Sequence, residues 1–222
     1  MQTSTTSSYS ELYSAYASGR LDPAFVLLLE TQSMLRGGVR SALAVSEVIS
    51  GLMLERDIPV SLSVGAGDRA LALIEQIEAE TAGQVQGTSS DESYADISEL
   101  PDPLSGVASA AMQGRGWQAT APGIHRLALE VGSELEVELY RIQPGARVPR
   151  HTHGGQEFTL VVSGGFSDET GSFGPGDLSV KGPDDTHQPV GDEDGVCFAL
   201  AVRDAGLRFT GIMGVIQRML GK

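Results

Sequence analysis

Cysteine, histidine and aromatic residues are scarce in this chain of 222 residues, and acidic residues outnumber basic ones. The chain has 1 cysteine and 4 histidines, and aromatic residues make up 5% of it. One cysteine cannot form an internal disulfide, so a reducing compartment is the natural environment. The 15 lysines and arginines against 29 aspartates and glutamates give a formal net charge of −14 at pH 7. This balance argues against direct binding of nucleic acid or of an anionic membrane surface.

Targeting and membrane-spanning segments are also missing from the sequence pattern. Residues 1–10 contain no basic residue and no apolar core, so they do not resemble a secretory signal peptide. No stretch reaches the roughly 18–20 consecutive apolar residues that a membrane span requires. We therefore expect a cytoplasmic protein without membrane contact.

Three of the four histidines fall within residues 145–187. His151 and His153 are two positions apart, so on a β-strand both side chains point to the same face. Gly154-Gly155 then offers a turn that returns Glu157 toward them, and His187 enters a later strand after its own turn. Three imidazoles and a carboxylate suit a divalent first-row metal. We predict a metal site formed by His151, His153, Glu157 and His187; the plainer alternative is surface histidines near a glutamate by chance.

The first 80 residues show helical periodicity in four segments. We expect helices from Ser10 to Gly19, from Pro23 to about Leu35 with Gly37-Gly38 as its end, over about 39–55, and from Asp68 onward. The last two carry apolar stripes at helical spacing: Val45, Val48, Ile49 and Leu52, then Ala70, Leu73, Ile74 and Ile77. Four short helices form a marginal core by themselves, so this bundle would gain from a metal, a partner or a second copy.

From Trp117 onward the pattern is that of strands. They are expected at 124–129, 134–141, 157–163, 177–181 and 196–202. Alternation within the second predicts that Leu135, Val137 and Leu139 face a core, and that Glu134, Glu136, Glu138 and Tyr140 face solvent. His125 is either a group that supports a metal ligand or an ordinary strand residue. Cys197 is either a small buried hydrophobe or a redox-sensing thiol.

Composition marks the remaining boundaries. Residues 81–104 contain five acidic residues and no lysine or arginine, which predicts an acidic linker between a helical domain, 1–80, and a strand-rich domain, 105–206. Residues 207–222 place Ile212, Val215, Ile216 and Met219 in helical register, which predicts a C-terminal helix.

The spacing from Gly145 through His151, His153 and Glu157 to Gly164 resembles the first motif of the cupins. Gly176 and His187 resemble the second motif more loosely. The resemblance implies an α+β fold: a small N-terminal helical bundle followed by a C-terminal antiparallel β-barrel, the cupin double-stranded β-helix, with its metal inside.

The order of helices, linker and cupin resembles the ChrR-type anti-sigma factors along nearly the full length. The residues that carry this resemblance are 12–21, 145–157, 184–189 and 207–211. It implies that the helices hold a sigma factor and that the cupin part modulates release under oxidative stress. It also implies zinc at His151, His153, Glu157 and His187, although manganese, iron and nickel accept the same ligands.

The resemblance breaks in the helical half. The family's helical domain holds a second zinc through histidine and cysteine, and the later positions fall here at about Gln32, Arg36 and Val39. An amide, a guanidinium and an isopropyl group do not form a zinc site, so we expect one metal per chain.

Three functions follow from these observations. The first is a regulatory anti-sigma factor, the second a metal-dependent cupin dioxygenase or related oxidoreductase, and the third a structural homodimer paired through its helices.

Overall fold

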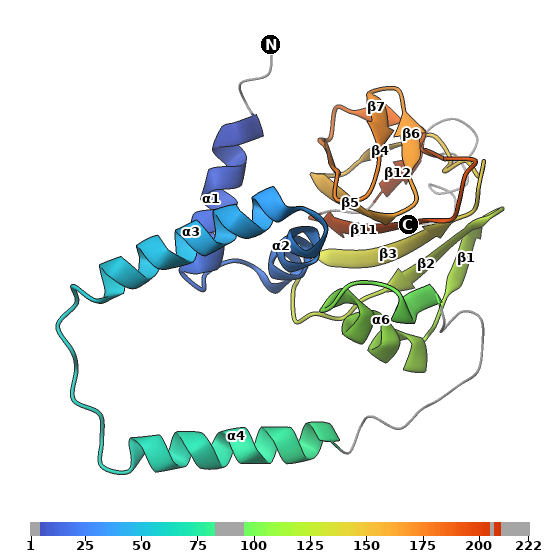
Figure 1. The fold of residues 1–222 in the computed structure, drawn as a ribbon. Coiled ribbons are helices and arrows are strands. Elements are labelled where there is room, and N and C mark those ends of the chain that lie inside the picture. Colours follow the sequence, from blue (N-terminus) through green and yellow to red (C-terminus); the bar gives the residue numbers. More distant parts are fainter. Residues whose placement is uncertain (1–4, 83–95, 205–206, 210–222) are drawn as a thin grey trace.

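A computed structural model describes residues 5–82, 96–204 and 207–209 of the protein. The helices are α1 (Thr5–Ala17), α2 (Pro23–Leu35), α3 (Gly37–Leu54), α4 (Ala66–Ala82) and α6 (Leu104–Gln113). The strands are β1 (Gln118–Ala121), β2 (Ile124–Ala128), β3 (Glu136–Ile142), β4 (His151–His153), β5 (Glu157–Ser163), β6 (Phe166–Asp168), β7 (Gly171–Phe173), β8 (Leu178–Lys181), β9 (Thr186–His187), β10 (Val190–Gly191), β11 (Cys197–Arg203) and β12 (Leu207–Phe209). Helices therefore precede antiparallel sheets, as the sequence predicts (Figure 1).

Helix α2 forms where the sequence predicts it, with a capped start and a buried face. Asp22 Oδ1 accepts a hydrogen bond from the Ala24 backbone N–H at 2.9 Å. Pro23 occupies the first turn, where its missing N–H has no intrahelical partner to lose. Leu28 and Leu29 are fully buried and join the core that α2 shares with the strands.

The prediction that Gly37-Gly38 ends α2 is wrong, because these glycines begin α3. Arg36, in an extended conformation, separates the two helices by one residue. A glycine that ends a helix usually adopts positive φ, as Gly19 does after α1, whereas neither Gly37 nor Gly38 does so.

The predicted helical stripes are present but do not close into a four-helix bundle. On α3, Val45, Val48, Ile49 and Leu52 are 52–63% exposed. Leu73, Ile74 and Ile77 of α4 are exposed as well. Helix α3 packs against α1 and α2, whereas α4 lies apart from the other helices (Figure 1). Periodicity identifies an apolar face, but it does not say what covers that face.

Helix α3 corrects the expectation that no segment is long and apolar enough to span a membrane. By length and composition alone its 18 residues meet that criterion, and 6% of them are buried. The same 18 residues include two charges, Arg40 and Glu47. A single helix of this kind is weak evidence for a membrane span, because apolar helices of other kinds meet the same criterion.

The strands form three antiparallel sheets. The largest has the order β1-β2-β3-β11-β5-β8, and the two smaller ones have the orders β10-β6-β7 and β12-β4-β9. The predicted strand 157–163 coincides with β5, and the other predicted strands agree with the observed ones within one or two residues. Backbone pairing among the described strands does not join the three sheets into one closed barrel.

Helix α6, which the sequence pattern did not predict, and the end of the predicted linker belong to the core. Ile97 and Leu104 are fully buried and Leu100 nearly so, all within the same apolar cluster as α2 and the large sheet. The acidic composition of 81–104 concealed these spaced apolar side chains. The earlier linker residues, 83–95, lie outside the described residues.

The predicted C-terminal helix is wrong at its start. Leu207–Phe209 forms β12, which pairs antiparallel with β4 so that Phe209 lies opposite His151. The free edge of β4 offers backbone hydrogen bonds that a local helical pattern cannot reveal. The rest of that predicted helix, 210–222, lies outside the described residues.

Candidate metal centre

Three short strand segments bring the four predicted ligands together. His151 and His153 lie on β4, Glu157 begins β5, and His187 lies on β9 directly opposite His151. All four are buried. At the turn between β4 and β5 the Asp204 carboxylate lies against Gly155, where a Cβ would come 1.8 Å from its oxygen, so a larger residue there would displace Asp204.

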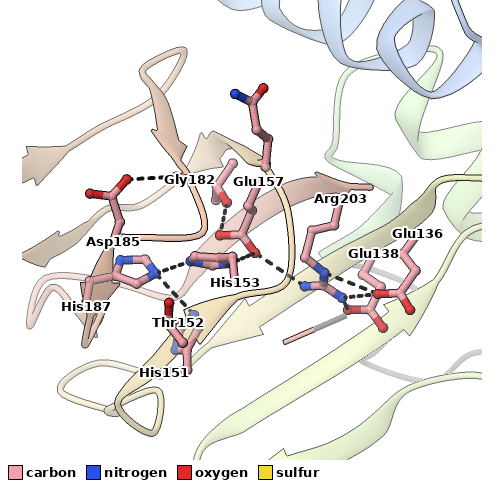
Figure 2. A network of polar contacts seen from close by, with 12 residues as sticks. Glu136, Glu138, His151, Thr152, His153, Glu157, Gly182, Asp185, His187 and Arg203 are labelled. Carbon is pink, nitrogen blue, oxygen red and sulfur yellow. Dashed lines mark hydrogen bonds and ion pairs between the residues drawn. The ribbon is translucent and has the colours of Figure 1, made fainter. Parts of the chain in front are cut away.

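The imidazoles face one another at short range (Figure 2). His187 Nε2 lies 3.1 Å from His151 Nε2 and 3.1 Å from His153 Nε2. Glu157 Oε2 lies 3.7 Å from His153 Nδ1. One ligand atom from each of the four residues falls within 4.8 Å of all the others. The structure thus brings together all four residues that the sequence predicted.

Neighbouring acceptors fix how two of these rings are protonated. His151 Nδ1 lies 2.8 Å from the Pro149 carbonyl oxygen, and His187 Nδ1 lies 2.8 Å from Asp168 Oδ2. A carbonyl and a carboxylate accept hydrogen bonds, so each Nδ1 carries the proton and each Nε2 of a neutral ring presents a lone pair. Burial lowers the pKa of His151 to about 4, which keeps that ring neutral at pH 7.

Asp168 supports His187 from outside the cluster. Its side chain is fully buried and also pairs with Lys181 Nζ at 3.0 Å. Burial alone would raise the pKa of Asp168, but hydrogen bonds from Thr170, His187 and Lys181 outweigh it and hold that pKa below its ordinary range. The sequence reading missed Asp168; its position on β6, remote in sequence from the histidine motif, gives no local signal.

Glu157 is held by two donors. Thr159 Oγ1 donates to Glu157 Oε1 at 3.0 Å, and Arg203 donates to Glu157 Oε2 at 3.4 Å. Arg203 is 3% exposed and also pairs with Glu138 and Glu136 (Figure 2). The central strand β11 places Arg203 directly between Glu157 on β5 and Glu136 on β3. The sequence reading missed this arginine, whose only signal is a basic residue at the end of an apolar strand.

Glu138 and Tyr140 overturn part of the predicted solvent face of β3. Glu134 and Glu136 are exposed as predicted, but Glu138 is buried and accepts a hydrogen bond from the Tyr140 hydroxyl at 2.6 Å. Arg126 pairs with the other oxygen of Glu138 at 2.6 Å. The alternation itself is correct. The helices cover the apolar face of β3, and on the polar face Glu138 turns toward Arg203 whereas Glu134 and Glu136 stay exposed.

The sequence did not decide the roles of Cys197 and His125, and neither residue belongs to the cluster of four candidate ligands. Cys197 is fully buried in a second apolar cluster, and burial raises the pKa of its thiol to about 12. These facts favour the small buried hydrophobe. His125 lies on β2, and its buried Nδ1 has no hydrogen-bond partner within the described part of the chain. It does not belong to the cluster of candidate ligands.

Gln32, Arg36 and Val39 make contacts of another kind than metal binding. Gln32 donates to the Gly176 carbonyl oxygen, Arg36 pairs with Asp177, and Val39 packs against the main core. Within the described residues, 5–82, 96–204 and 207–209, one group has the composition of a metal site. It consists of His151, His153, Glu157 and His187.

Comparisons with known proteins agree with this architecture. Residues 106–204 match the family model of the ChrR cupin-like domain. The anti-sigma-E factor ChrR of Cereibacter sphaeroides is 31% identical over 202 residues, which cover 91% of each chain. The crystal structure of Rhodobacter sphaeroides SigE in complex with the anti-sigma ChrR matches with a TM-score of 0.66 and 29% identity, covering 88% of this chain and 96% of that one. With a cupin-like half and a relative of this identity along nearly its whole length, the chain belongs to the ChrR family of anti-sigma factors.

Proposed function

We propose that this chain is a cytoplasmic anti-sigma factor whose helices hold a sigma factor and whose cupin part binds one divalent metal. Family membership and the likeness to a ChrR chain crystallised with SigE support the partner. The buried His151, His153, Glu157 and His187 support the metal. In the finer proposal, oxidative or small-molecule stress acts on the cupin part and weakens the hold on the sigma factor.

The approach of two nitrogen lone pairs carries the metal proposal. His151 Nε2 and His187 Nε2 lie 3.1 Å apart, and each ring has its proton on the other nitrogen. Two acceptors at this distance repel one another unless a proton or a cation lies between them. One divalent cation bound by His151, His153, Glu157 and His187 would satisfy these lone pairs and the buried carboxylate together. Nitrogen and carboxylate donors accept zinc, manganese, iron and nickel alike, and only the family resemblance puts zinc first.

Elemental analysis of the purified full chain tests this part directly. We expect one metal per chain in the wild type and none in the variant His151→Ala/His187→Ala. Two metals per chain would contradict a metal-free helical half. Stoichiometric metal in the double variant would show that the cation binds elsewhere.

The exposed apolar faces of α3 and α4 support the sigma-factor surface. Contiguous exposed apolar side chains of this kind mark sites that a partner covers. Between the two helices, Ile58, Val60, Leu62 and Val64 are exposed at alternate positions and extend the apolar surface. Arg40 and Glu47 lie within the apolar span of α3, where a bilayer would disfavour them. A protein partner therefore fits this surface better than lipid.

Substitutions on this surface test the partner. We expect full-length wild type to retain a sigma factor in a pull-down, and Ile49→Asp or Ile74→Asp to weaken retention at least tenfold. Val180→Asp is the matched control, because Val180 is an apolar residue of β8 that is 40% exposed. Failure of the wild type with every sigma factor encoded beside it would contradict the proposal. Light scattering of the free chain would reveal a homodimer that uses the same face.

A further inference from the structure

Helix α2 packs directly on the back of the strand that carries Glu157. The Phe25 ring of α2 meets the Phe158 ring of β5 edge to face, with centroids 4.9 Å apart and planes at 87°. Phe158 follows Glu157, and successive side chains of a strand point to opposite faces. Glu157 therefore faces the histidines while its neighbour faces the helix.

The central strand repeats this arrangement. Arg203 faces inward and pairs with Glu157, whereas Val202 faces the helix side and belongs to the core that includes α2. Helix α2 contacts both β5 and β11. A shift of either strand relative to the histidines is thus also a shift relative to α2.

Two polar contacts near the other end of α2 attach it to the turn before β8. Gln32 Nε2 donates to the Gly176 carbonyl oxygen at 3.1 Å in a buried contact, and Arg36 pairs with Asp177 at 2.6 Å. The turn is bonded to β5 in its own right, because Gly176 N donates to Val161 O at 2.8 Å and Val161 N donates to Asp177 O at 3.0 Å. Both ends of α2 are therefore attached to the same strand.

A partly open pocket of about 170 Å³ lies at the edge of the contact between α2 and the sheet, lined by Phe25, Leu135, Gln156, Phe158, Val202 and Asp204. Its mouth reaches solvent, because Gln156 and Asp204 are exposed. The lining residues Gln156 and Phe158 flank Glu157 on β5, so this pocket lies next to the candidate ligand.

We propose that α2 and β5 form a latch, in which metal bound by His151, His153, Glu157 and His187 strengthens the docking of α2 on the sheet. The latch rests on the proposed metal site but not on sigma-factor binding. A metal that fixes the Glu157 carboxylate also fixes the backbone of β5, and this restrains Phe158 and the turn at Gly176. By thermodynamic linkage the coupling is reciprocal. The factor by which bound metal strengthens the docking of α2 equals the factor by which docked α2 raises the metal affinity.

The first test uses this reciprocity in the full chain without a sigma factor. Zn²⁺ affinity is measured by competition with a chromophoric chelator for wild type, for Gln32→Ala/Arg36→Ala and for Phe25→Leu. We expect both latch variants to bind Zn²⁺ about fivefold or more weakly, the lower end of typical couplings between sites. Arg141→Ala is the matched control, because it removes an ion pair with Asp96 at 2.9 Å that involves neither α2 nor β5.

The second test needs no variant and so survives any folding defect. Hydrogen exchange of residues 23–35 is followed in the wild-type chain with a chelator and with Zn²⁺. The latch requires exchange in α2 to slow when Zn²⁺ is bound, and unchanged exchange would overturn it. Wild-type Zn²⁺ affinity in both latch variants would overturn it as well. Absence of Zn²⁺ binding by the wild type would instead remove the metal site itself, and the latch with it.

Discussion

Replacing Arg203 with methionine is the sharpest test of the buried charge network. The change keeps most of the side-chain volume and removes the cation that pairs with Glu138 and Glu157. Breaking a buried ion pair by removing one partner costs about 3–5 kcal/mol, because the other charge is left uncompensated. Glu138 keeps Arg126 and Tyr140, which places the expected loss at the lower end.

We therefore expect Arg203→Met to lower the free energy of unfolding by about 3 kcal/mol. The contact with Glu136 adds less than about 1 kcal/mol, because that glutamate is exposed. The assay is urea unfolding of the full chain in a chelator, which keeps metal out of the comparison. Arg141→Met, which removes the partly exposed pair with Asp96, serves as the control and should cost less than about 1 kcal/mol.

The loss should also depend on pH in a defined direction. Burial alone would raise the pKa of Glu138, but Arg203 and its other partners outweigh burial and lower it. A carboxylate with a depressed pKa stabilises the fold above its unfolded pKa, and this stabilisation disappears as pH falls through the folded pKa. In Arg203→Met the same carboxylate becomes easier to protonate, so the difference from wild type should shrink between pH 7 and pH 4. A variant within 1 kcal/mol of wild type at pH 7 would refute the network as a stabilising element.

Three further predictions concern the cluster and the cysteine. Either His151→Ala or His187→Ala should lose bound metal, measured by elemental analysis, and a full equivalent retained by each would contradict its role as a ligand. Asp168→Asn should weaken Zn²⁺ binding about 10–100-fold in a chelator competition, because it loosens the orientation of His187; unchanged affinity would show that Asp168 has only a structural role. Cys197 should resist thiol-specific labelling at pH 8 in the folded chain and react on unfolding, because burial raises its pKa to about 12. Rapid labelling of the native protein would revive the redox-sensing interpretation.

The sequence predicted the candidate ligands because their signal is local. His151, His153 and Glu157 lie within one strand-turn-strand unit, and period two and a glycine turn are enough to bring their side chains together. His187 joins these side chains because its strand, β9, pairs directly with β4. Helix α2 and strand β5 were equally readable, since a proline at the start of a helix and a continuous apolar run depend on neighbouring residues alone.

Other features depended on partners that are distant in the chain. The same alternation that correctly divided β3 into two faces could not reveal that helices cover one face and Arg203 the other, so Glu138 was wrongly predicted to face solvent. Helix α6 was missed for a related reason, because its burial depends on the sheet beneath it. The stripes on α3 and α4 show the converse case, in which a correct apolar pattern remains exposed in the isolated chain.

By itself the sequence determined the periodicity of most elements, the turn after His153 and the chemistry of the four candidate ligands, because each follows from residues a few positions apart. Tertiary structure alone decided which polar side chains are buried, where Arg203 and Asp168 contact the candidate ligands, and how α2 lies against β5. These features depend on which surfaces meet, and that is set by the packing of the whole chain.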